Sequence, residues 1–130
     1  MPDILALPHA LVNIETGNNE DWVESFKFVV DDGSANNATM PQFDIRGMEF
    51  EMEMRRKASD HEVLISASTA DLKLSIGSFP NYGFLLLNVP LDEMKNMTPG
   101  QYVADVIAKE GGFVRKCMTL TVKIVEGVTR

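Results

Sequence analysis

The chain has little of the chemistry on which enzymes and metal proteins depend. Its 130 residues include one cysteine, two histidines and one tryptophan. A single cysteine excludes an internal disulfide, which is typical of a reducing compartment or of a particle assembled in one. Two histidines and one cysteine at wide spacing provide no pair of metal ligands. We therefore expect no catalytic residues, no metal and no cofactor.

Long apolar runs and an excess of positive charge are also missing. The longest apolar runs, residues 84–87 among them, are too short to span a membrane. The first 15 residues have no basic region followed by an unbroken apolar run, so we expect no secretory signal. The net charge is −7, and the one basic cluster, residues 55–57, indicates a solvated turn. Nucleic acid and membrane are therefore not expected as partners.

What the chain does have is the pattern of a β protein. In residues 47–55, the side chains at positions 48, 50, 52 and 54 are apolar, and those at 49, 51, 53 and 55 are charged. A helix would spread these residues around its circumference, so the period of two predicts a strand. Further strands are expected at residues 11–15, 22–30, 62–66, 72–76, 84–89, 101–109 and 113–125.

The connections between these strands predict the fold class. Residues 69–71 are expected to form a hairpin, and Gly111 and Gly112 join the last two strands in another. The nearly continuous apolar strand at 84–89 predicts a central position, covered on both faces. We therefore predict one domain over residues 1–130, with 1–10 as an N-terminal arm. Its fold is all-β, a two-layer antiparallel immunoglobulin-like β-sandwich of seven to eight strands.

Tyr102 supports this class. It follows Pro99 and Gly100 near the start of the penultimate strand. Immunoglobulin-like sandwiches place a "tyrosine corner" there, two residues before an inward-facing site, which would be Ala104 in this chain. An ordinary strand tyrosine explains the residue equally well, so both interpretations stay open.

Cys117 falls on the polar face of the last strand by alternation, so we expect it to be exposed. A reactive thiol needs a nearby histidine and a positive setting. His9 lies in the arm, and His61 lies between two acidic residues. An incidental thiol is therefore the preferred interpretation.

Two acidic segments are candidates for chemistry. Glu49, Glu51 and Glu53 line one strand face at about 7 Å intervals, which matches some glycosidase spacings. Like charges in a row are more typical of a solvent face or a protected edge. Residues 31–37 carry oxygen atoms that calcium accepts, but they lack the ligand period and closing glutamate of an EF-hand. We interpret them as a solvated loop.

Three segments resemble a known family. They are GNNEDW at residues 17–22, DIRGMEFEMEMR at 44–55, and TPGQYVADV at 98–106 with the closing EGVTR. Over residues 17–130 the chain resembles small phage and prophage tail-associated β-sandwich proteins. In layout it is similar to the immunoglobulin-like N-terminal domain of phage baseplate upper proteins, where G-D-(D/x)-(W/F) and G-x-Y-x-x-D motifs recur. Asn18 and Asn19 replace the acidic pair of the first motif.

The resemblance implies a non-catalytic structural part of a phage or prophage tail, baseplate or fibre, in the virion or the bacterial cytoplasm. Its partners would be other tail or baseplate proteins, and a homo-oligomer is expected because virion parts act as symmetric copies. The chain ends where baseplate proteins continue into further domains. This favours a stand-alone adaptor over a receptor-binding protein.

Such a module would present a strand edge or a loop face to neighbouring subunits. The candidate interaction residues are Thr119, Thr121 and Lys123 in the last strand and Asp31 and Asp32 in the polar loop. The alternative function is a small ligand-recognition module, such as a carbohydrate-binding sandwich. That alternative predicts an exposed aromatic cluster on one sheet face.

Overall fold

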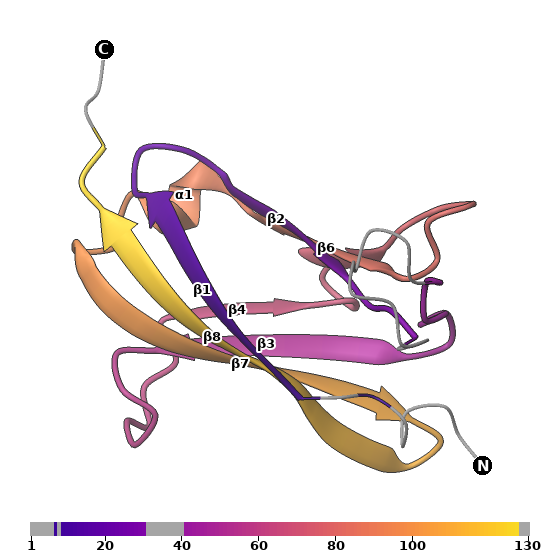
Figure 1. The fold of residues 1–130 in the computed structure, drawn as a ribbon. Helices are drawn as coiled ribbons and strands as arrows, with labels where there is room; N and C mark the ends of the chain where they lie inside the picture. Colours follow the sequence, from indigo (N-terminus) through magenta and orange to yellow (C-terminus); the bar gives the residue numbers. More distant parts are fainter. Residues whose placement is uncertain (1–6, 8, 31–40, 128–130) are drawn as a thin grey trace.

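A computed structural model describes residues 7, 9–30 and 41–127, which form two packed β-sheets (Figure 1). The strands are β1 (Ala10–Gly17), β2 (Trp22–Lys27), β3 (Glu49–Arg55), β4 (Ile65–Ser68), β5 (Leu74–Ile76), β6 (Phe84–Val89), β7 (Gly100–Glu110) and β8 (Phe113–Val125). A single helical turn, α1 (Leu91–Met94), follows β6. The larger sheet has the order β1-β8-β7-β3-β4 and the smaller one β2-β6-β5. The predicted all-β, two-layer sandwich is confirmed.

The last two strands form the longest pairing in the molecule. β7 pairs antiparallel with β8 from Gly100 to Glu110. Gly111 and Gly112 make the turn with φ values of 57° and 85°. These positive values are accessible to glycine without steric cost, so the Gly-Gly step sets the hairpin as predicted.

The core lies between the inner faces of the two sheets. In β3 the side chains of Phe50, Met52 and Met54 point inward with exposed fractions of 0–1%. Leu85 and Leu87 of β6 belong to the same buried cluster, from the opposite sheet. Burying side chains of this size stabilises the fold by roughly 1.5–3 kcal/mol each. The apolar residues of the alternating pattern therefore form the core-facing side of each sheet.

The Tyr102 side chain makes the contact expected of a tyrosine corner. Its hydroxyl donates a hydrogen bond to the backbone carbonyl of Thr98, four residues upstream. Arg56 donates to the same hydroxyl at 3.2 Å. Ala104, two residues later, points into the core with 1% exposure. This contact fits the tyrosine-corner interpretation of Tyr102, whereas the immunoglobulin-like assignment stays a prediction.

The sheet is not antiparallel throughout. β1 pairs with β8 in parallel, from Ala10 opposite Met118 to Gly17 opposite Val125. After Gly17 the chain crosses to the smaller sheet and continues as β2, so β1 forms no hairpin with its neighbour in sequence. Alternation reveals which face of a strand is buried, but not which strand lies beside it or in which direction.

Two further expectations were wrong. Residues 69–71 do not close a hairpin, because β4 belongs to the larger sheet and β5 to the smaller one. β6 is central in its sheet, but only one of its faces is covered, since Leu86 is 39% exposed and Asn88 is also exposed. A two-layer sandwich buries one face of each sheet and leaves the other to solvent.

Candidate functional site

The predicted interaction residues of the last strand lie on the outer face of the larger sheet. Thr119, Thr121 and Lys123 alternate with buried residues of β8, as expected. The strand itself is not an edge, because β1 pairs with one side of it and β7 with the other. A partner would therefore reach these side chains through the sheet face. Asp31 and Asp32 lie outside the described residues.

Thr119 is tied to its neighbours. Its hydroxyl donates to a carboxylate oxygen of Asp105 at 3.2 Å and lies 3.0 Å from Nε2 of His9. This contact connects the segment before β1 with β8 and β7. The histidine is therefore next to a threonine, and it is not part of a Cys–His dyad.

Oppositely charged residues are paired across the same outer face. The nitrogen-to-oxygen distances are 3.8 Å for Lys123–Glu15, 3.6 Å for Lys116–Asp105, 2.7 Å for Lys109–Glu51 and 2.8 Å for Arg55–Glu53. The hydrogen bond to Glu51 raises the pKa of Lys109 above its ordinary value. Water competes for such exposed groups, so these pairs orient the side chains more than they stabilise the fold.

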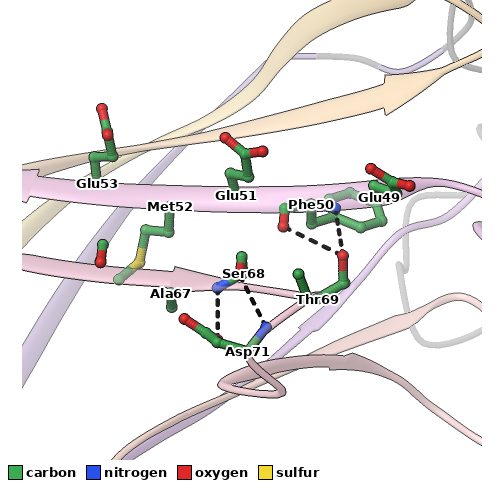
Figure 2. Close-up of a pocket in the computed structure, with 11 residues that line it drawn as sticks. Glu49, Phe50, Glu51, Met52, Glu53, Ala67, Ser68, Thr69 and Asp71 are labelled. Carbon is green, nitrogen blue, oxygen red and sulfur yellow. Dashed lines mark hydrogen bonds between the residues drawn. The ribbon is translucent and has the colours of Figure 1, made fainter.

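A polar groove of about 250 Å³ lies at the β4 edge of this sheet (Figure 2). Glu49, Glu51 and Glu53 stand in a row on β3, and residues 66–71 line the other side. Glu51 and Glu53 are engaged by Lys109 and Arg55. None of the residues that line the groove is a histidine, cysteine or lysine, and the hydroxyl groups there belong to Ser66, Ser68 and Thr69.

The polar groups on the β4 side of the groove serve the backbone. Asp71 accepts hydrogen bonds from the backbone amides of Ser68 at 3.0 Å and Lys73 at 2.8 Å. Burial opposes ionisation of this carboxyl, but these amides together hold its pKa below the ordinary value. Thr69 accepts a hydrogen bond from the amide of Phe50 at 3.2 Å. The groove is therefore built from turn and edge contacts, and the acidic row is a solvent-exposed face.

Cys117 is buried, which corrects the expectation that it lies on the polar face. Its exposed fraction is 1%, and its thiol donates to the carbonyl of Val106 at 3.5 Å. Val106 pairs with Met118 and the next residue, Ile107, with Lys116, so Cys117 is the extra residue of a β-bulge. The bulge turns both Cys117 and Met118 inward. Burial raises the pKa of the thiol to about 12, so it is not a nucleophile at neutral pH.

The described part of the chain lacks the groupings that a metal site or a helical membrane span would need. Within residues 7, 9–30 and 41–127, no three His, Cys, Asp or Glu side chains are grouped to hold a metal ion. His61 is exposed in the loop between β3 and β4. The oxygen-rich residues 31–37 lie outside this part of the chain. No helix in the same ranges is long and apolar enough to cross a membrane.

The aromatic residues do not form the sheet-face cluster that the ligand-binding alternative predicts. Trp22 and Tyr102 are 1% and 2% exposed and act as core anchors. Phe79 is 79% exposed and packs against Tyr82 in the loop between β5 and β6, with ring centroids 6.0 Å apart. The guanidinium of Arg46 covers the Tyr82 ring at 3.8 Å, so that ring face is occupied.

Sequence reasoning missed an apolar groove of about 230 Å³ at the β1 side of the sandwich. Its lining residues are Ala10, Val12, Phe26, Lys27, Phe28, Val29, Cys117 and Met118. Val12 and Phe26 are only half-buried there, although both pack against the core. The alternation of Ala10, Val12 and Ile14 was visible in the sequence. Nothing in it indicated that this strand would lie at the edge of a sheet.

Comparison with known proteins gives little guidance. Among solved structures, the chain is similar to CopC from Methylosinus trichosporium OB3b, with 12% sequence identity and a TM-score of 0.43. The alignment covers 91% of this chain and 90% of that chain. A likeness this low carries no argument about function or ligands. No family model matches the chain, and no curated protein matches it.

Proposed function

We propose that the protein is a non-catalytic interaction module and a structural part of a phage or prophage tail, baseplate or fibre assembly. The phage context rests on the resemblance of residues 17–130 to tail-associated sandwiches. The observation that carries the interaction role is the free edge of β1. In the described part of the chain, no strand pairs with the side of β1 that faces away from β8.

The other edge strands differ from β1 in ways that discourage pairing. β4 has four residues and β5 has three, so each offers a short ladder. β2 has six residues and ends in Lys27. β1 has eight residues, ALVNIETG, with no lysine, arginine or proline. Short edges and charged edge residues are the usual protection against strand addition, and β1 has neither a short ladder nor a basic residue.

Several reactive groups of the described residues are engaged in structural contacts, which fits a non-catalytic module. Cys117 is buried in a bulge, Asp71 holds a turn, and His9 contacts Thr119. In the acidic row on β3, Glu51 is paired with Lys109 and Glu53 with Arg55. An assembly role needs none of these groups to react.

The tail role is tested by asking whether purified tail particles contain the chain. Tail particles are purified from an induced culture of the organism that encodes the chain, and peptides are quantified by mass spectrometry. A structural part is expected at a fixed ratio to other tail proteins after a high-salt wash. Particles from a strain that lacks the gene serve as the control. If the chain stays in the soluble fraction and is absent from washed particles, the tail role is wrong.

A further inference from the structure

We infer that the free edge of β1 pairs with β1 of a second copy of this chain, antiparallel and centred on Asn13. The two larger sheets would then join into one continuous sheet. This inference rests on the proposed interaction role and deepens it, because it names the edge, the partner and the register.

The backbone of β1 offers half of its hydrogen-bonding groups to a partner. Within the part of the chain that the structure describes, residues Ala10–Gly17 pair with β8 and with no strand on the other side. On an edge strand, the N–H and C=O groups of the other side remain available to a further strand. An eight-residue ladder is long enough to seat a second strand of ordinary length.

The inner face of β1 is incompletely buried. Val12 and Ile14 are half-buried, whereas their partners on β8, Leu120 and Val122, are 0% exposed. The apolar groove lies beneath the same edge and is lined by Val12 and Phe26. An added strand with apolar residues at alternate positions would cover both. A second β1 has this pattern.

Geometry limits the register of two β1 strands. Residues that pair across the two strands must point to the same face of the sheet. The two-fold axis must therefore lie midway between two copies of one residue, so that this residue pairs with itself. Centring on Asn13 pairs Val12 with Ile14 of the other copy, in both directions. Leu11, which is 79% exposed, then lies opposite the stem of Glu15. Centring on Ile14 would instead place Val12 opposite Thr16, which buries less apolar surface.

Charge also permits this pairing, although each copy carries a net charge of −7. Glu15 is the one charged residue of β1, and it lies 3.8 Å from Lys123 of its own chain. In the register centred on Asn13, Glu15 faces Leu11 and not another glutamate. The two Asn13 amides face each other and can exchange a hydrogen bond. No like charges stand directly opposite each other on the two strands.

The test uses charge at the symmetry centre. Asn13 is exposed on the outer face, so Asn13→Lys and Asn13→Asp leave the core untouched. Sedimentation velocity at low salt, over a wide range of protein concentration, measures the dimer dissociation constant. We expect a dimer for the unchanged chain. Each variant should have a dimer dissociation constant at least about fivefold higher, because like charges then face each other. An equal mixture of the two variants should restore the dimer.

Gln101 provides the matched control, since it is exposed on the same outer face but lies on β7, two strands inward from β1. Gln101→Lys and Gln101→Asp should leave dimerisation unchanged, and urea unfolding checks that all variants fold. A monomer at every concentration, equal effects at positions 13 and 101, or no recovery in the mixture would overturn the inference. If the chain is present in washed particles but is a monomer in solution, the inferred β1–β1 pairing is wrong and the tail role stands. A β1 dimer that is absent from particles would overturn the tail role alone.

Discussion

The two sides of the sandwich end in different ways. On the β4 side, the ladder stops after four residues, where Ser68 and Asp71 exchange hydrogen bonds between side chain and backbone at 3.0 and 3.1 Å. The chain then crosses to the smaller sheet. On the β1 side, an eight-residue strand runs along the edge above an apolar groove. The same alternating pattern thus produces a closed side, where a turn ends the strand after four residues, and an open side, where the strand runs for eight.

The largest expected effect compares two phenylalanines on opposite sides. Phe50 of β3 is 0% exposed, and its ring centroid lies 5.9 Å from that of Phe28. Phe50→Ala should lower the free energy of unfolding by about 3–5 kcal/mol, because it leaves a cavity in a packed core. Phe26 lines the apolar groove and is half-buried, so Phe26→Ala should cost roughly half as much. Urea unfolding measures both, and equal losses would show that the two sides are packed equally well.

The next effect concerns the turn that closes the β4 side. Asp71→Ala removes the acceptor for the amides of Ser68 and Lys73, and should cost about 1 kcal/mol of unfolding free energy. The pKa of Asp71 is lowered in the folded chain, so the contribution is present above the ordinary value of 3.8 and is lost as pH falls through the lowered one.

Unfolding measured from pH 7 down to the acid range should therefore show a smaller loss on acidification for Asp71→Ala than for the unchanged chain. Asp92→Ala is the control, because the Asp92 side chain is 90% exposed. If both substitutions alter the pH profile equally, the turn is not what the carboxylate supports.

A smaller effect of opposite sign is expected at Leu72, which follows this turn. Its φ is 67°, a conformation that L-residues other than glycine rarely adopt, and its side chain is 78% exposed. Leu72→Gly should raise the free energy of unfolding by about 0.5–1 kcal/mol, since the relief of strain exceeds the entropy cost of glycine. Leu72→Ala keeps the Cβ atom and should give no gain. A gain from alanine equal to that from glycine would contradict the strain argument.

The last effect is kinetic and leaves the free energy of unfolding unchanged; it concerns the open side, where Cys117 lines the groove. Its pKa of about 12 leaves, at pH 8, roughly a thousandfold less thiolate than an ordinary thiol has. Labelling by a thiol reagent should therefore be slow in the folded chain and fast in urea. Rapid labelling without urea would mean that the groove opens far enough to expose the bulge.

The candidate site was predictable in part. The outward placement of Thr119, Thr121 and Lys123 followed from alternation, and the structure agrees. The sequence did not indicate which strand forms the edge of this sheet. β1, from the other end of the chain, pairs in parallel with β8 and takes the edge position. The bulge at Cys117 was equally hidden, since it is defined by the register of β7 against β8. A property that depends on a neighbouring strand cannot be predicted from the sequence of the strand alone.

The sequence by itself determined which residues could be buried together and where the chain could turn. The period of two in β3, the Gly111-Gly112 step and the position of Tyr102 are local features, and side-chain sterics act on them locally. Tertiary structure alone decided which strands became neighbours, which edge stayed free and where a groove remained. These depend on contacts between residues up to about a hundred positions apart, as in the pairing of Ala10 with Met118. Such contacts form only when both sheets bury their apolar faces at once.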